Sequence, residues 1–203
     1  MKMIGEINMN NLIYNSLIKK GFINPNNEEY LWLPEMIWFA PDKLDYYNND
    51  RYDYLRTEGL FLFAKNAYGD FFAWNKDDES VLFCDQGSGY GFLYAPNLEG
   101  AIFRRIIEFA NGDYVDFCFD DKKEEMDEDE AEGYISETQA ISMLKEYKKS
   151  FGEYFQSGWI DALDRIIQNG LIDENGFISE SQKTEIISSN LNYEQLNMSI
   201  NLN

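Results

Sequence analysis

The sequence predicts an α+β fold, in which an antiparallel-rich sheet of about four to six strands is flanked by helices and followed by a C-terminal helical extension. Three observations predict it. Aromatic-rich runs at residues 60–65, 70–75 and 80–85 follow one another at close spacing. A strongly apolar helix pattern begins at Leu98. Two amphipathic helix patterns lie beyond residue 133.

The N-terminal region is predicted to be helical. Residues 9–20 place their apolar side chains on one helix face, and Gly21 is a typical helix stop. Pro34 is expected to open a helical turn over residues 36–39. Residues 41–58 are polar and rich in tyrosine, so a loop is expected there.

The three aromatic runs are expected to form a meander, because their connections at 66–69 and 76–78 are short enough for hairpins. Asn97 can cap the helix that starts at Leu98, and Gly112 can end it. Apolar side chains cover most of the circumference of this helix. Such a helix is expected in the core rather than on the surface.

The chain divides into three segments. Residues 1–119 form the main α+β unit and residues 120–132 an acidic loop. Residues 133–203 form a C-terminal helical extension that is expected to pack on the same domain and to end in a frayed tail. Ser136 and Gln139 have the spacing of a capping box at the start of the first helix of this extension.

Shorter elements complete the pattern. Residues 114–119 are a further strand candidate and residues 183–190 a weak helix. A tight turn is expected at Gly176. The sequence around this glycine resembles a calcium-binding loop, but Leu171 and Gln182 occupy the first and twelfth positions, where the strongest carboxylate ligands are needed. The turn is therefore the preferred interpretation.

The composition excludes several classes of function. The 203 residues include no histidine, and 37 acidic residues against 17 basic ones give a net charge of −20. Without histidine there is no Ser-His-Asp or Cys-His catalytic site and no His-bearing zinc site. The charge opposes binding to nucleic acid and to anionic membranes. It favours attraction to a basic partner.

The cysteine content and hydropathy point to the cytoplasm. Cys84 and Cys118 each lie in an apolar run and are expected to be buried, reduced thiols. No N-terminal segment resembles a signal peptide, and no apolar run is long enough to span a membrane. No metal or other cofactor is expected.

The acidic residues are unevenly placed. Residues 120–132 hold nine acids and two lysines, a net charge of −7, whereas residues 1–119 carry −8 and residues 133–203 carry −5. A run of this kind is usually a solvated loop. It could also be a docking surface for a basic protein, and the carboxylates proposed for that role are Asp127, Glu128, Asp129 and Glu130.

The tyrosine-rich segment is a second candidate docking surface. Its tyrosines alternate with carboxylates, and no core periodicity explains them. Aromatic residues are enriched at the centres of protein interfaces. The alternative is a loop folded over the core. The residues proposed for partner binding are Asp45, Tyr46, Tyr47, Asp50, Tyr52 and Asp53.

Two further patterns bear on nucleotide binding and catalysis. The glycines of residues 87–91 do not form a G-x-G-x-x-G motif, and no nearby lysine completes a phosphate-binding loop. A flexible connection is therefore expected there. Asp70 and Asp85 could perform acid–base chemistry only if the fold brought them together.

The order of these elements resembles the SUKH superfamily. Leu33-Pro34 lies in the N-terminal part, Gly69-Asp70 precedes aromatic strand residues that end at Trp74, and a helix follows the sheet. The resemblance covers about residues 10–112. The tyrosine-rich residues 41–58 stand where the family usually has Asn-Gly.

The superfamily comprises immunity proteins of bacterial toxin systems and includes a yeast cell-wall-synthesis regulator. The resemblance implies structural roles for the five matching residues, Leu33, Pro34, Gly69, Asp70 and Trp74. It implies no catalysis. It implies that the chain binds and neutralises a cognate toxin, often a nuclease.

The sequence therefore predicts a bacterial, cytoplasmic immunity protein that is not an enzyme and that binds a basic toxin through its acidic surface. An intracellular regulatory scaffold of the same fold, with a non-toxin partner, is the alternative. A histidine-free enzyme that uses carboxylates is a third, less favoured hypothesis. The sequence names neither the partner nor the oligomeric state.

Overall fold

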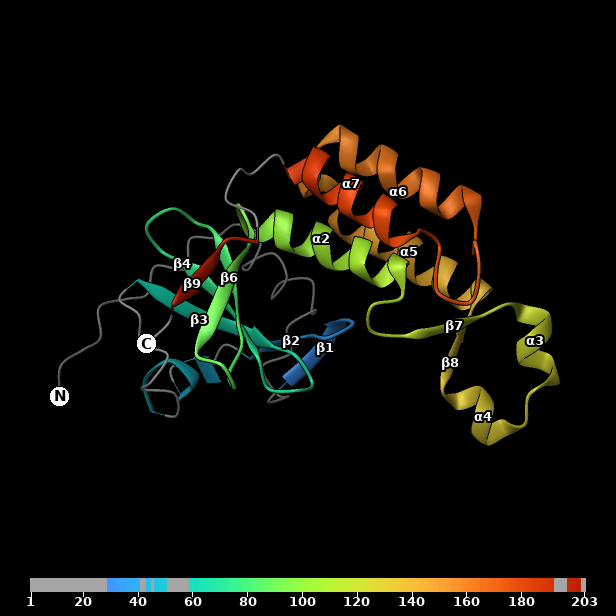
Figure 1. The fold of residues 1–203 in the computed structure, drawn as a ribbon, viewed down its shortest axis with the longest axis horizontal. Coiled ribbons are helices and arrows are strands. Elements are labelled where there is room, and N and C mark those ends of the chain that lie inside the picture. Colours follow the sequence, from blue (N-terminus) through green and yellow to red (C-terminus); the bar gives the residue numbers. More distant parts are fainter. Residues whose placement is uncertain (1–28, 41–42, 45, 51–58, 192–196, 202–203) are drawn as a thin grey trace.

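The computed structural model describes residues 29–40, 43–44, 46–50, 59–191 and 197–201. Figure 1 shows three parts along the longest axis: a sheet, a group of helices beside it, and a small arm at the far end. Helix α2 (Leu98–Asn111) runs between the sheet and the other helices. The predicted helix at residues 9–20 lies outside the described residues.

The fold class is confirmed as α+β with an antiparallel sheet. All neighbouring strands of this sheet pair antiparallel, in the order β1-β2-β3-β4-β5-β6-β9. It has seven strands, more than the predicted number. The strands are β1 (Glu29–Leu33), β2 (Met36–Phe39), β3 (Leu60–Lys65), β4 (Phe71–Asn75), β5 (Val81–Cys84), β6 (Tyr90–Ala95) and β9 (Ser199–Asn201).

The prediction of a helical turn after Pro34 was wrong. Strands β1 and β2 form a hairpin there, with Leu33 opposite Met36 and with Pro34 and Glu35 in the turn. Glu35 has a φ of 56°, the left-handed conformation that tight turns need. The apolar pattern over residues 36–39 suits one helical turn as well as a short strand, so pairing with β3 decides the outcome.

The predicted meander is confirmed for β3, β4 and β5. Phe72 lies opposite Ala64 on one side and Phe83 on the other. The turn between β3 and β4 contains Gly69, whose φ of 94° favours glycine. Residues 87–91 were expected to be a flexible connection, but the last two of them, Tyr90 and Gly91, begin strand β6.

Helix α2 begins and ends where its caps predict. The Asn97 side chain accepts a hydrogen bond from the Gly100 amide at 2.8 Å. Gly112 has a φ of 83°, and its amide bonds back to the last turn. The helix is buried on nearly all sides, because β1 and β6 contact it on one side and helices contact it on the other.

The C-terminal extension packs on α2. Its helices are α5 (Glu137–Phe151), α6 (Ser157–Asn169) and α7 (Glu180–Leu191). The capping box of Ser136 and Gln139 is present. Phe103 of α2 stacks on Trp159 of α6, with ring centroids 4.7 Å apart. One hydrophobic core therefore includes residues of both the sheet and the extension.

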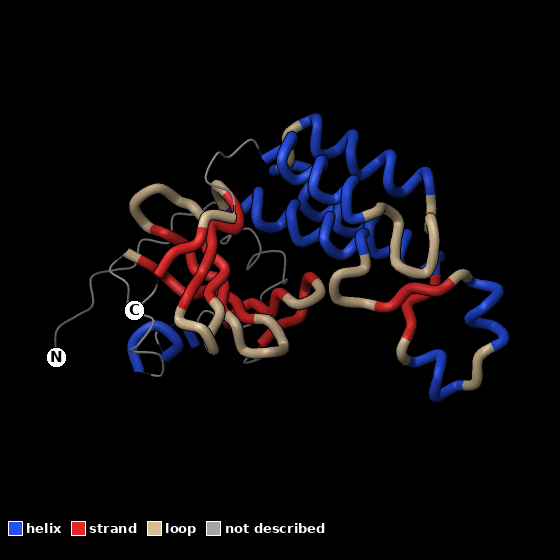
Figure 2. The backbone as a smooth tube through the Cα atoms, in the orientation of Figure 1, coloured by secondary structure: helices blue, strands red, loops and turns tan. Residues whose placement is uncertain are grey.

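Two predictions for the C-terminal half need correction. The acidic segment contains two short helices, α3 (Asp120–Glu125) and α4 (Glu128–Glu132), instead of an irregular loop. The tail returns to the sheet, where β9 pairs with β6. Figure 2 shows β9 at the edge of the sheet beside β6, although the two strands are far apart in the sequence. Backbone pairing explains a strand there although Ile200 is its only apolar residue.

The remaining expectations concern cysteine, turns and membranes. Cys84 and Cys118 are buried thiols without a disulfide, and burial raises the pKa of Cys84 to about 12. The predicted turn at Gly176 is confirmed by a hydrogen bond from the Ile172 amide to its carbonyl, 2.9 Å long. Among the helices described, none is both long and apolar enough to cross a membrane.

Candidate interaction surfaces

The acidic segment forms an arm that projects from the end of the molecule. Strands β7 (Asp116–Cys118) and β8 (Tyr134–Ser136) pair in parallel at its base, and α3 and α4 lie beyond them (Figure 1). Neither helix contains a buried residue. We call residues 119–133 the acidic arm. Its helices present their side chains to solvent.

Both lysines of the arm are engaged by the rest of the protein. Lys122 forms an ion pair with Glu174 in the turn before α7. Lys123 donates to the Tyr134 carbonyl at 2.6 Å and to the Gln139 side chain at 3.0 Å. Residues 124–132 carry seven carboxylates and no basic side chain. The outer part of the arm is therefore uniformly negative.

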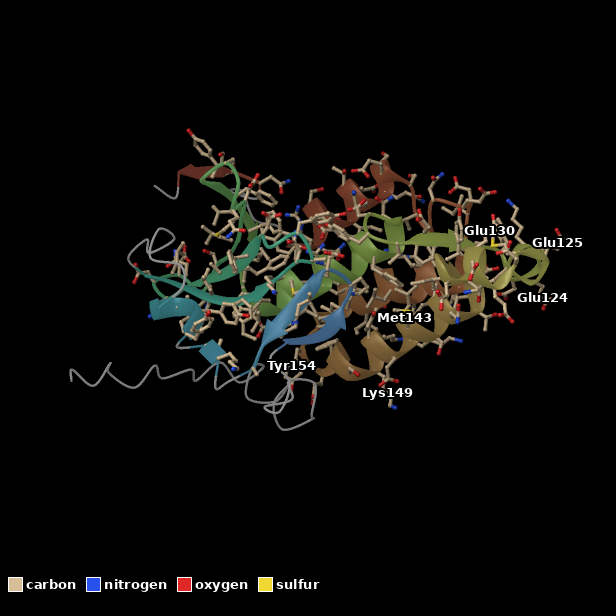
Figure 3. The ribbon with its side chains drawn as sticks, turned by 90° about the horizontal axis from the view of Figure 1, so that it is seen from below. Glu124, Glu125, Glu130, Met143, Lys149 and Tyr154 are labelled. Carbon is tan, nitrogen blue, oxygen red and sulfur yellow. The ribbon has the colours of Figure 1, made fainter. Side chains whose placement is uncertain are left out.

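The four predicted carboxylates of the arm lie together and are exposed, as the docking hypothesis requires. Asp127 caps α4 by accepting from the Glu130 amide at 2.9 Å. Glu128, Asp129 and Glu130 follow in the first turn of that helix, where carboxylates interact favourably with the helix dipole. Figure 3 shows Glu124, Glu125 and Glu130 at this end of the molecule.

Asp120 fastens the arm to α5. Its carboxylate accepts from the Thr138 hydroxyl at 2.5 Å and from the Thr138 amide at 3.1 Å. Hydrogen bonds from the side chains of Thr138 and Ser136 and from the Thr138 amide lower the pKa of Asp120, because they favour its charged form.

We expect the Thr138 amide to report this contact in a pH titration followed by NMR. Because the folded pKa of Asp120 is lowered, its stabilising contribution is complete above the ordinary value of 3.8 and is lost as the pH falls through the lowered pKa. The amide shift should therefore have its midpoint below pH 3.8. In Asp120→Asn the titration should disappear. A midpoint at or above the ordinary value contradicts the contact.

The tyrosine-rich candidate surface is only partly described. Tyr46 lies in the helical segment η2 (Tyr46–Asp50) and is exposed. Tyr47 is buried and stacks on Phe39 with ring centroids 3.8 Å apart, so its assignment to a partner surface was wrong. The Asn48 side chain ties this segment to the backbone of Leu62. Burial of Tyr47 supports the alternative, a segment folded over the core.

The structure does not bring the two candidate surfaces together. Residues 46–50 lie at the sheet end of the molecule and the acidic arm at the other end (Figure 1). Asp50 closes the η2 segment. Asp45, Tyr52 and Asp53 lie outside the described residues.

The structure places the five residues of the sequence resemblance in the β1–β2 and β3–β4 hairpins. Leu33 is buried, Pro34 lies in the β1–β2 turn, and Trp74 lies half-buried in β4. Gly69 and Asp70 end the β3–β4 turn. The Asp70 carboxylate accepts a hydrogen bond from the backbone amide of Gln86 in the neighbouring β5–β6 turn, at 3.1 Å. Asp70 therefore links two adjacent hairpin turns.

A buried ionic network on α2 was missed from the sequence. Glu108 pairs with Arg104 at 2.8 Å and with Arg105 at 3.2 Å, and it accepts a hydrogen bond from the Tyr94 hydroxyl. Burial raises the pKa of Tyr94 well above its ordinary value. The spacing of these charges, three and four residues apart in a helix, was the available signal.

This network fixes α2 against the sheet. Arg104 donates to the Tyr94 carbonyl at 2.9 Å and to the Asn197 side chain at 2.9 Å, and Arg105 donates to the Glu35 carbonyl at 3.1 Å. The guanidinium of Arg104 also lies 4.2 Å from the centre of the Tyr94 ring. Glu108 is thus held between two guanidiniums and a phenol, an arrangement that joins elements distant in sequence.

No group of acidic or cysteine side chains in the described residues could hold a metal ion. Asp70 and Asp85 lie in neighbouring turns, but each carboxylate accepts hydrogen bonds from turn amides.

Comparisons with protein families, with characterised proteins and with solved structures find no match for this chain.

Proposed function

We propose that this chain is a non-catalytic immunity protein that binds and neutralises a basic cognate protein, of nuclease type, through the acidic arm. The observation that carries the proposal is the arrangement of charge on the arm. Both lysines contact the body of the protein, and the seven carboxylates beyond them are presented to solvent. The resemblance to the SUKH superfamily supports the same function, and the site of action is the cytoplasm.

The physical basis is electrostatic attraction. A nuclease presents a basic cleft to phosphate, so a projecting, uniformly acidic element can occupy that cleft and block it. The net charge of −20 adds a long-range field of the same sign. Such fields raise association rates by about 10- to 1,000-fold and lose their effect in salt.

The test neutralises four carboxylates of the arm in the full chain: Asp127→Asn, Glu128→Gln, Asp129→Asn and Glu130→Gln. Asparagine can still cap α4, so the arm should keep its structure. Binding to the protein encoded by the neighbouring gene is measured by surface plasmon resonance. We expect the association rate to fall about tenfold in low salt and the salt dependence to weaken.

The matched control removes the same charge from exposed carboxylates elsewhere. It combines Asp77→Asn, Glu146→Gln, Asp161→Asn and Glu185→Gln, which lie outside the arm and are all exposed. This variant has the same net charge as the arm variant but should associate nearly as fast as the parent chain. Equal losses in both variants would show that net charge, and not the arm, drives association.

A further inference from the structure

A cavity of about 450 Å³ lies on the sheet surface, away from the acidic arm. It is lined by residues of β5, β6 and the segment around β9. Three of them are aromatic: Phe83, Phe92 and Tyr90. One is a carboxylate, Asp85, at the start of the turn between β5 and β6. We call this cavity the aromatic pocket.

The register of the strands explains why these side chains share one face. Phe83 lies opposite Phe92, and the Asp85 amide donates to the Tyr90 carbonyl at 2.9 Å. Successive side chains of a strand alternate between faces, so Asp85 shares the face of Phe83, and Tyr90 shares that of Phe92. Ser199 of β9 lies opposite Phe92 and continues the same row.

The aromatic side chains are accessible to a ligand. Tyr90 is 52% exposed, and Phe83 and Phe92 are half-buried, with ring centroids 5.2 Å apart. Helix α2 covers the inner end of this row, where Tyr94 is buried. The outer end is therefore an open surface of aromatic rings.

The carboxylate at the rim is exposed and stays charged. Asp85 accepts from the Gly87 amide at 2.7 Å and from the Ser88 amide at 3.1 Å. Both backbone hydrogen bonds lower the pKa of Asp85, because they favour the ionised form. The bond from Ser88 has the larger effect and that from Gly87 the smaller. A negative charge is thus fixed beside three aromatic rings.

Aromatic rings and a carboxylate together select an organic cation. The face of an aromatic ring attracts a guanidinium or ammonium group, and the carboxylate adds a charged hydrogen-bond acceptor. The same row already binds one guanidinium, since Arg104 lies over Tyr94 and within 5.6 Å of the Phe92 ring centre. Glu108 pairs with both Arg104 and Arg105, so a second cation is expected at the outer end of the row, where Asp85 supplies its counter-charge.

We propose that the aromatic pocket binds an arginine side chain of a basic polypeptide. The planar guanidinium can stack on Tyr90 and Phe92 while its edge donates to Asp85. Arginine suits this geometry better than lysine, whose ammonium is more strongly hydrated and cannot stack. The pocket lies on the sheet and the acidic arm lies beyond the helices, so this contact is separate from the arm (Figure 1).

The experiment uses the full chain, labelled with ¹⁵N, and the probe N-acetyl-arginine-N-methylamide. Its control probe is the citrulline analogue, which has nearly the same shape and no charge. Dissociation constants are fitted to the amide shifts of Ser88 and Gly91, which line the pocket. We expect the arginine probe to bind at least about fivefold more tightly than the citrulline probe.

Two variants test the two groups that bind the cation: one removes the carboxylate charge and the other removes an aromatic ring. Asp85→Asn should weaken arginine binding about fivefold, while the asparagine oxygen can still accept from both turn amides. Tyr90→Ala should weaken it by a similar factor and Tyr90→Phe should restore it, because the ring face and not the hydroxyl binds the cation. The matched controls are Asp77→Asn and Tyr68→Ala, exposed residues of other hairpin turns that should leave binding unchanged.

The outcomes separate this proposal from that of the arm. The variant with a neutralised arm should bind the arginine probe at Ser88 and Gly91 as the parent chain does. Equal binding of both probes, or shifts that do not respond to Asp85→Asn and Tyr90→Ala, overturns the pocket proposal. Shifts confined to residues 124–132 overturn it as well, but they leave the function proposed for the arm intact.

Discussion

Replacing Glu108 by glutamine is expected to destabilise the protein by about 3–5 kcal/mol, because the change leaves buried guanidiniums without their counter-charge. The side chains of Arg104 and Arg105 are 11% and 1% exposed, so water cannot replace the lost carboxylate. The Tyr94 hydroxyl loses its charged acceptor at the same time. Urea unfolding followed by circular dichroism measures the change in the free energy of unfolding.

The control is Glu146→Gln on α5. Glu146 also pairs with a basic side chain in its own helix, Lys149, but both side chains are mostly exposed and 3.8 Å apart. Surface pairs of this kind contribute about 0–1 kcal/mol. A loss at Glu108 no greater than that at Glu146 would show that the buried network contributes little to stability.

Local signals in the sequence predicted the caps of α2 and the start of α5. The Asn97 cap, the Gly112 stop and the capping box of Ser136 and Gln139 each act within a few residues of a helix end. Their hydrogen bonds depend on neighbours in the chain and not on the rest of the fold. For this reason α2 begins and ends, and α5 begins, close to the predicted positions.

Strand pairing could not be predicted where a strand depends on a distant partner. Residues 199–201 have only one apolar side chain, that of Ile200, and form a strand because β6 offers an edge more than a hundred residues earlier in the chain. Residues 36–39 are too few for the alternation of a strand to be told from a helical turn. In both cases tertiary pairing outweighs the local preference of the sequence.

Some features of the candidate sites could likewise be predicted from the sequence, and others depend on the fold. The acidic arm was visible in the sequence, because charge density needs no knowledge of the fold. The sequence could not show that Lys122 and Lys123 contact the body of the protein. Nor could it show that Tyr90 and Asp85 share a face with Phe83, because this depends on the register of two strands.

The second large effect is expected at Gly112, where the end of α2 meets the turn that precedes α7. Gly112 has a φ of 83°, and a Cβ atom there would lie 1.9 Å from the carbonyl oxygen of Asn175. Alanine in this conformation costs about 1–2 kcal/mol by itself. Moving the backbone at Asn175 adds a cost typical of overpacking, about 1–3 kcal/mol.

Gly112→Ala should therefore lower the free energy of unfolding by about 3 kcal/mol, measured by urea unfolding. Gly133→Ala is the matched control, because Gly133 also follows a helix but has a φ of −71° and a Cβ there would meet its nearest atom at 3.5 Å. Alanine at that position should leave stability nearly unchanged.

Hydrogen exchange adds a local measurement. If the Asn175 carbonyl is displaced in Gly112→Ala, the Phe177 amide, which bonds to the Ala110 carbonyl at 2.8 Å, should exchange faster. Unchanged protection of Phe177 together with unchanged stability would contradict the close approach of these two backbones.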